Sequence, residues 1–322
     1  MIRTRVLRSG PKSLALAARI LREGGLVAFP TETVYGLGAR AYDAAAARRV
    51  FKAKGRPSDN PLIVHVADEA MAADVVRRVT PLAQRLMDAF WPGPLTLILE
   101  KSRRVPDAVT AGGRTVAVRC PGHKDARALI RALGEPVAAP SANRSGRPSP
   151  TTAAHVLRDL RGRVALILDG GPCRKGLESA IVDARGKRPV VLRHGTLTDL
   201  EIARAAGVPL GKAGRSAPVA PGTRHRHYAP ACKVVLVSPA FVRRGALAGP
   251  GAGLLHRSPR LAGKPAFTRR VRGGPAAYAA ALFAGLRAAE AKGVRTLYVE
   301  TLADRGVGRA VMDRLRRAAA RR

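Results

Sequence analysis

The chain has 322 residues and a formal net charge of +36, which suits about two domains and predicts binding of polyanions such as nucleic acid or nucleotide phosphates. The alternative is a surface made arginine-rich by compositional bias. Three widely spaced cysteines without a CxxC pair argue against a disulfide framework and a zinc ribbon. No apolar run has the ~18 residues of a membrane span, and residues 1–10 lack a signal-peptide core, so we expect a cytoplasmic protein without membrane contact.

Helix and strand patterns alternate through the first 210 residues. The first element is an amphipathic helix over 11–23, which Gly24 and Gly25 end. In chain order we then expect a strand at 26–29, a helix at 44–54, a strand at 62–66, a helix at 81–89 and strands at 95–99, 116–119, 137–139, 164–168, 181–182 and 190–192. This alternation predicts an α/β fold with a mixed, buried sheet.

The composition changes after Leu210. Residues 211–230 are rich in Gly, Pro, Ser and basic residues and have no apolar period, which is typical of a linker. A second unit follows, with a strand at 234–237, a helix at 276–291, a strand at 296–299 and a helix at 308–319. The sequence therefore predicts a domain over 1–210, a linker over 211–230 and a small α/β domain over 231–322.

The segment Pro30–Gly38 (PTETVYGLG) follows a predicted strand, where α/β sheets place ligand-binding loops. It combines two hydroxyls, a carboxylate and a phenol with glycines that let the backbone approach a ligand. Residues 36–41 also fit a loose G-x-G-x-x-A pattern. We consider a dinucleotide site less favoured, because these glycines lie several residues beyond the strand.

Two further polar segments suit phosphate binding. In Lys52–Pro61, the cations Lys52, Lys54 and Arg56 are placed to contact a triphosphate, and a solvated basic turn is the alternative. In Ala138–Pro150, hydroxyls and amides precede a helix expected to begin near Thr151, which indicates an anion cradle or an ordinary capping loop. A Walker A lysine is absent, so any ATP must be bound by another phosphate cradle. His225 and His227 form a lone H-x-H without a third ligand nearby, so we expect no protein-held metal.

Together, these segments and their order resemble the Sua5/YrdC family of threonylcarbamoyl-AMP synthases. The matching strings are PTETVYGLG (30–38), KGRPSDN (54–60), PLIVH (61–65), SANRSG (141–146), ESAIVD (178–183) and LRHG (192–195). PGTRHRHYAP (221–230) and the segments 278–287 and 306–310 are similar to the linker and C-terminal domain of the longer Sua5 branch. The resemblance covers nearly the whole chain. It implies a YrdC-like twisted mixed sheet with helices and a basic cavity, followed by a small Rossmann-like α/β domain.

The resemblance implies a nucleotidyltransferase that makes threonylcarbamoyl-AMP and pyrophosphate from L-threonine, bicarbonate and ATP, with Mg²⁺ carried by ATP. A separate tRNA threonylcarbamoyl-transferase complex would consume the product at the adenosine next to the anticodon, and direct tRNA or RNA contact is left open. By resemblance, threonine is bound by Thr33, His65, Arg119 and Ser179. ATP is bound by Lys52, Arg56, Asn60, Thr115, Ser141, Ser149, Arg193 and Tyr228, with Lys54 and Arg56 as catalytic cations and Tyr228 as a lid.

The sequence departs from the family pattern in places. Ala180 stands where the family has threonine, Cys120-Pro-Gly-His123 differs from the usual string, and the Gly-, Pro- and Arg-rich stretch 245–274 indicates an eroded, short second domain. One alternative function is a non-catalytic RNA-binding protein of the same fold, because the chain is basic. A carbamoyltransferase is disfavoured, because the chain lacks an acylphosphatase region and zinc-finger cysteines.

Overall fold

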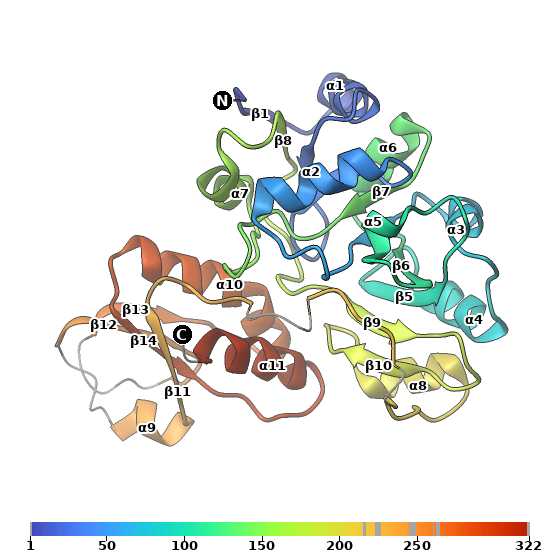
Figure 1. Cartoon of the computed structure of the whole chain (residues 1–322). Coiled ribbons are helices and arrows are strands. Elements are labelled where there is room, and N and C mark those ends of the chain that lie inside the picture. Colours follow the sequence, from blue (N-terminus) through green and yellow to red (C-terminus); the bar gives the residue numbers. More distant parts are fainter. Residues whose placement is uncertain are drawn as a thin grey trace.

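The computed structural model describes residues 2–214, 217–222, 227–244, 249–259, 261 and 265–320. It contains a large mixed sheet built by the first part of the chain and a small parallel sheet built by the last part, as Figure 1 shows. The mixed α/β architecture predicted from the sequence is confirmed. The limits of the predicted linker stay a prediction, and 215–216 and 223–226 lie outside the described residues.

Within the described residues, the larger sheet has ten strands in the order β1-β8-β2-β3-β7-β4-β6-β5-β9-β10. The sheet contains both parallel pairs, such as β4 with β6 and β5 with β9, and antiparallel pairs, such as β3 with β7. The strands are β1 (Arg5–Arg8), β2 (Val27–Phe29), β3 (Gly36–Arg40), β4 (Ile63–His65), β5 (Leu95–Glu100), β6 (Thr115–Arg119), β7 (Val137–Ala139), β8 (Leu166–Asp169), β9 (Ala180–Asp183) and β10 (Val190–Arg193).

The helices of this domain begin and end where local chemistry dictates. Asp43 accepts hydrogen bonds from two amides at the start of α2, and Gly55, at a φ of 61°, ends it. Thr152 caps α7, close to the predicted start near Thr151. The helices are α1 (Pro11–Arg22), α2 (Ala44–Lys54), α3 (Glu69–Val75), α4 (Pro81–Phe90), α5 (Asp107–Thr110), α6 (Lys124–Leu133), α7 (Ala153–Leu160) and α8 (Asp199–Ala206).

Strand β3 corrects the interpretation of the PTETVYGLG glycines. Gly36 and Gly38 lie within the strand, between β2 and β7, and not in a loop before a helix. A Cβ added at Gly38 would lie 2.7 Å from Val137 Cγ1 and 2.9 Å from Phe29 Cε1. Gly38 is therefore needed for close packing against its neighbours rather than for approach to a ligand, and the dinucleotide pattern has no structural basis.

The smaller sheet has the order β11-β14-β12-β13, and its neighbouring strands are all parallel. The prediction that 245–274 is eroded was wrong: this stretch holds two of the four strands, although 245–248, 260 and 262–264 lie outside the described residues. The elements are β11 (Lys233–Val237), α9 (Pro239–Arg244), β12 (Gly249–His256), β13 (Pro265–Arg270), α10 (Pro275–Ala291), β14 (Thr296–Glu300) and α11 (Val307–Ala319).

The two parts of the molecule share a hydrophobic cluster. Val34 and Leu177 of the first domain and Tyr228 of the predicted linker pack with buried residues of the second domain, including Phe283. In Figure 1, α10 and α11 lie on the side of the smaller sheet that faces the larger domain. Among the described residues, no helix is long and apolar enough to cross a membrane.

Candidate active site

A cavity of about 50 Å³ lies where the larger sheet meets the predicted linker and the segments 52–61 and 138–150, which were predicted to bind phosphate. Strand geometry explains the side of the cavity that the sheet forms. Because alternate residues of a strand share a face, His65 lies beside Ile63 on β4, and Arg119 lies on the same face of β6 as Ala117 and Thr115. The described lining residues are Thr31, Thr33, Val34, Gly36, Arg56, Ile63, His65, Arg119, Ala139, Pro140, Ser141, Glu178, Ser179, Arg193, Pro221, Gly222, His227 and Tyr228.

Arg119 is held rigidly at one end of the cavity. Its guanidinium donates to Glu32 Oε1 at 2.6 Å, to Thr33 Oγ1 at 3.0 Å and to the Gly93 carbonyl at 3.1 Å. Glu32 also accepts from the Gly122 amide. Although burial opposes ionisation of Glu32, the Arg119 charge lowers the pKa of that carboxyl. Arg119 and Thr33, both predicted to bind threonine, are therefore brought together in one preorganised group.

His65 presents a neutral imidazole to the cavity. Its Nδ1 lies 3.2 Å from the Ile63 carbonyl, and its ring packs edge-on against Phe29. Burial and the nearby Arg119 charge lower the pKa of His65 to about 3. At neutral pH the ring is therefore an uncharged hydrogen-bonding group rather than a cation.

Arg56 forms the second cationic corner. It donates to Asn60 Oδ1 at 2.6 Å and to the carbonyls of Asn60 and Pro61, so the turn after α2 is folded around its own arginine. Burial lowers the pKa of Arg56 to about 9, which leaves the group protonated at pH 7. The same Asn60 oxygen accepts from the Gly222 amide at 3.0 Å, which joins this turn to the predicted linker.

Arg193 and Ser179 form the third corner. The Ser179 hydroxyl lies 2.7 Å from the Thr96 hydroxyl and accepts from Arg193 Nη2 at 3.2 Å. Arg193 also donates to the Pro221 carbonyl at 2.9 Å. Burial lowers the pKa of Arg193 to about 10, so it too is charged at pH 7.

Residues of the predicted linker line part of the cavity. Tyr228 is buried, has a positive φ of 69°, and stacks on Phe283 with ring centroids 5.2 Å apart. The Arg314 guanidinium lies 5.6 Å from the Tyr228 ring centroid. Tyr228 thus lies between the cavity and the second domain. His225, the partner of His227 in the H-x-H pair, lies outside the described residues.

A second cavity, of about 330 Å³, lies further along the same face of the sheet. Thr115 and Ala117 of β6 line it, together with Pro61, Arg114 and residues 217–219 of the predicted linker. Thr115, predicted to contact ATP, lies on the same face of β6 as Arg119, with Ala117 between them. This volume is in the range of small-ligand sites, about 300–1,000 Å³.

Of four further residues of the predicted ATP site, only Ser141 lines the first cavity. Lys54 is buried beneath the loop 141–150, where its ammonium donates to the carbonyls of Ser141 and Asn143. Ser141 itself lines the cavity. Ser149 is buried and donates to Glu178. Lys52 is exposed in the last turn of α2 and lies outside the set of described lining residues.

Glu32, Asn143 and Glu178 were seen as polar residues of their segments but were given no role in the predicted site. Each lies inside a matching string, so the signal was present, but its role depends on partners far along the chain: Arg119 for Glu32, and Ser149 and Arg314 for Glu178. Among the described residues, no group of three His, Cys, Asp or Glu side chains could hold a metal ion.

A cavity lined by buried arginines, hydroxyls and a neutral histidine, next to a larger cavity, defines an α/β protein with a site suited to small polar, anionic ligands. The comparisons make this class specific. Residues 19–195 match the Sua5/YciO/YrdC family described as telomere recombination, and residues 195–320 match the threonylcarbamoyl-AMP synthase C-terminal domain. The chain belongs to the Sua5/YrdC family, in its long form.

Relatives that match nearly the whole chain support this assignment. The chain is 42% identical to the threonylcarbamoyl-AMP synthase of Pyrococcus abyssi, over 95% of this chain and 93% of the relative. It is also 42% identical to that of Bacillus subtilis, over 97% and 94%. The crystal structure of P. abyssi Sua5 complexed with L-threonine is 39% identical, covers 99% of this chain and 97% of that one, and has a TM-score of 0.88.

Proposed function

We propose that this protein is an L-threonylcarbamoyladenylate synthase, which uses L-threonine, bicarbonate and ATP and releases pyrophosphate. The observation that carries the proposal is the cavity itself, in which Arg56, Arg119 and Arg193 surround hydroxyl groups and a neutral His65. Fixed cations suit a reaction that brings together a carboxylate, a carbamate and a triphosphate, where positioning and charge stabilisation do most of the work.

The reaction balances as two steps. The threonine amine attacks bicarbonate and water leaves, which gives a carbamate. A carbamate oxygen then attacks the α-phosphorus of ATP, the bond to the β-phosphate breaks, and pyrophosphate leaves with its electrons. The protein needs to supply no covalent intermediate.

Arg119 and Thr33 are proposed to bind the end of the threonine substrate that carries its carboxylate and hydroxyl groups. The guanidinium already donates to Thr33 and Glu32, so a substrate carboxylate would meet a preorganised donor group. His65 and Ser179 line the same cavity and complete the threonine site. Because the His65 ring is uncharged, it does not repel the ammonium group of threonine, which must lose a proton before the amine can react.

ATP is proposed to extend from the first cavity into the second. The adenosine would lie beside Thr115, and the phosphates would lie between Arg56, Asn60, Arg193 and the loop that carries Ser141 and Ser149. Lys54 would act from beneath that loop by holding the Ser141 and Asn143 carbonyls, and exposed Lys52 would be a more distant cation. A cavity of about 50 Å³ has room for only a few waters. The contacts of Pro221, Gly222 and Tyr228 must therefore open to admit ATP, and their return would shield the labile product from water.

Mg²⁺ is proposed to enter on ATP. Of the carboxylates at the site, Glu32 is engaged by Arg119, and Glu178 is engaged by Ser149 and Arg314. These side chains do not form a protein-held Mg²⁺ site, so phosphate oxygens and water would be its ligands. The product would pass to a tRNA threonylcarbamoyl-transferase complex, and direct tRNA contact by the basic surface is a further part of the proposal.

Pyrophosphate release tests this function. Purified protein is incubated with ATP and Mg²⁺ while L-threonine and bicarbonate are each omitted in turn. We expect release only when both are present. Release without threonine would contradict the proposal and indicate a pyrophosphohydrolase, and folded protein without release that binds RNA with steep salt dependence would favour the RNA-binding alternative.

A further inference from the structure

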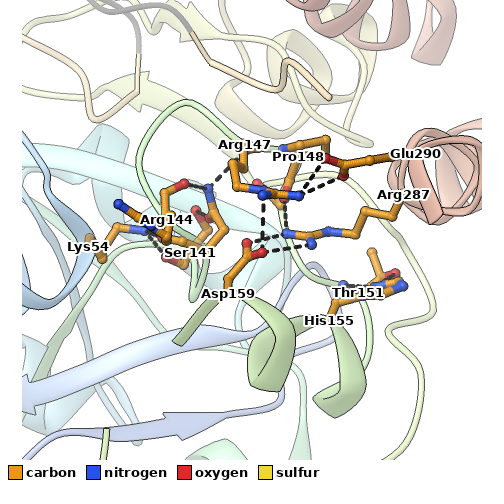
Figure 2. A network of polar contacts seen from close by, with 12 residues as sticks. Lys54, Ser141, Arg144, Arg147, Pro148, Thr151, His155, Asp159, Arg287 and Glu290 are labelled. Carbon is orange, nitrogen blue, oxygen red and sulfur yellow. Dashed lines mark hydrogen bonds and ion pairs between the residues drawn. The ribbon is translucent and has the colours of Figure 1, made fainter. Parts of the chain in front are cut away.

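An ion-pair network links the second domain to the loop 141–150 that borders the cavity. Arg287 of α10 donates from Nη2 to Asp159 Oδ2 at 2.6 Å and from Nη1 to Asp159 Oδ1 at 3.2 Å, and it also donates to the Pro148 carbonyl. Figure 2 shows this guanidinium lying between α7, which carries Asp159, and the loop. Both side chains are almost fully buried, with exposures of 1% and 0%.

A second pair lies beside the first. Arg147 of the loop donates to both carboxylate oxygens of Glu290 on α10, each at 2.7 Å, and its Nε lies 3.4 Å from Asp159 Oδ1. Two consecutive loop residues, Arg147 and Pro148, are therefore held by two side chains of one helix in the other domain. Figure 2 shows the four charged groups as one continuous cluster.

Hydrogen bonds within the loop connect this network to the cavity. The Asn143 amide donates to the carbonyls of Arg144 and Arg147, and its oxygen accepts from the hydroxyl of Ser141, which lines the cavity. Lys54 supports the same turn from the other side. At the far end of the loop, Ser149 donates to Glu178, which Arg314 of α11 pairs with at 3.1 Å. Helices α10 and α11 of the second domain thus both hold this loop, α10 directly and α11 through Glu178.

The chemistry of the network points to positioning rather than to stability. Burying two charges costs much of what their attraction returns, and apolar residues of similar volume often stabilise at least as well. The Nε of Arg287 is buried without a hydrogen-bond partner among the described residues, which adds to that cost. What a bidentate pair supplies, and an apolar contact does not, is a fixed orientation.

We propose that Arg287 and Glu290 are positioning residues for the nucleotide, through which the second domain holds the loop 141–150 in the shape that ATP requires. This inference rests on the proposed function. The network should affect ATP and not threonine. Arg119 is held by Glu32 and Gly93, and His65 lies against the Ile63 carbonyl. The network contacts none of these partners. Loss of the network should therefore weaken ATP binding and leave threonine binding intact.

The test compares Arg287→Met and Glu290→Gln with Arg309→Met. Arg309 of α11 also makes an ion pair across the two domains, to Asp199 at 2.6 Å, but this pair is half-exposed and does not contact the loop. Full-length proteins are compared for pyrophosphate release, for KM values of ATP and threonine, and for binding of α,β-methylene ATP and L-threonine by calorimetry. Thermal unfolding checks that each variant is folded.

We expect Arg287→Met to raise the KM for ATP and the dissociation constant of the analogue about tenfold, and Glu290→Gln to raise them severalfold, as is typical of a coupling between two sites. Threonine binding should stay within twofold, and Arg309→Met should behave as wild type. The reversed pair R147E/E290R should bind the analogue more tightly than either single reversal.

Equal loss of threonine and nucleotide binding, or equal effects in Arg309→Met, would overturn the inference and leave only domain docking. Unchanged analogue binding in folded Glu290→Gln and R147E would overturn it as well, even if Arg287→Met fails to fold. Wild-type protein that binds the analogue without releasing pyrophosphate would refute the proposed function, while the binding comparison would still decide the inference.

Discussion

At the scale of single residues, each cavity arginine already has hydrogen-bond acceptors before a substrate binds. Arg119 is matched by Glu32, and Arg56 and Arg193 are directed by carbonyl and amide oxygens. These contacts remove the freedom of long side chains, so the substrate does not have to immobilise them on binding. The neutral state of His65 follows from the same arrangement, because it lies next to Arg119 in a buried site.

Glu32→Gln tests whether the carboxylate orients Arg119. The substitution keeps the shape but leaves the buried guanidinium without its counter-charge, so we expect a loss of about 3 kcal/mol in the free energy of unfolding. We also expect a higher KM for threonine with a smaller change for ATP. Glu135→Gln is the matched control, since it breaks the more exposed Arg40–Glu135 pair at the surface. Steady-state kinetics in which both variants behave alike would contradict this role for Glu32.

The buried histidines predict how stability depends on pH. The pKa values of His65 and His227 are about 3 in the folded protein, against 6.5 for a free histidine, so below pH 6.5 the unfolded chain binds protons that the folded protein does not. Stability is therefore lost as pH falls from 6.5 toward 3, by about 1.4 kcal/mol per pH unit for each histidine.

His65→Asn isolates one of these contributions, because the asparagine amide can replace Nδ1 near the Ile63 carbonyl without titrating. Chemical denaturation between pH 7.5 and 5 should give a shallower decline for the variant than for wild type. Parallel declines would show that His65 is already free to protonate in the folded protein.

At the scale of elements, alternation along the strands explains how distant segments form one site. One face of β4, β6 and the neighbouring strands carries the cavity residues, while the opposite face contributes Val64, Val116 and Val118 to the main hydrophobic core. The loop after β7 and the turn after α2 add to the lining, together with residues 31–34 after β2, the Glu178–Ser179 pair, Arg193 and the predicted linker.

Strand β3 gives a direct test of this packing. Gly38→Ala should place a methyl group against Val137 and Phe29, which we expect to cost about 1–3 kcal/mol of stability because the neighbours must shift. Gly186→Ala is the control, since a Cβ there would have no heavy atom within 4 Å. Thermal unfolding should separate the two. If Gly38→Ala proves as stable as the control, the packing role of this glycine is wrong.

Sequence patterns predicted elements whose own residues carry the signal. The helix 44–54 has an Asp43 cap and a Gly55 stop, and α10 and α11 were found with limits within one residue. Strands β3 and β12 were missed because their glycines mask a strand pattern that only pairing with neighbouring strands reveals. The matching strings named the cavity residues Thr33, Arg56 and His65, and the resemblance also assigned Arg119 at the end of the predicted strand 116–119. The place of Lys54 beneath the loop, and its contacts to Ser141 and Asn143, could not be predicted, because they depend on tertiary packing.

At the scale of the whole molecule, the site belongs to both domains. The first domain supplies the three arginines, and Pro221, Gly222 and Tyr228 of the predicted linker complete the lining. The second domain contacts Tyr228 through Phe283 and Arg314. The second domain also reaches the loop 141–150 through Arg287 and Glu290. Reaction at the cavity should therefore depend on the long form of the chain as a unit.

In this cavity, we propose, the bicarbonate carbon is joined to threonine and then to AMP. The most direct measurement is mass spectrometry of a rapidly quenched reaction with ATP, L-threonine and ¹³C-bicarbonate, with Arg56→Met as the control variant. We predict an adenylate that contains threonine and one labelled carbon, formed together with pyrophosphate by wild type and strongly reduced in the variant. An adenylate of threonine that lacks the labelled carbon, or AMP without any adduct, would contradict the claim.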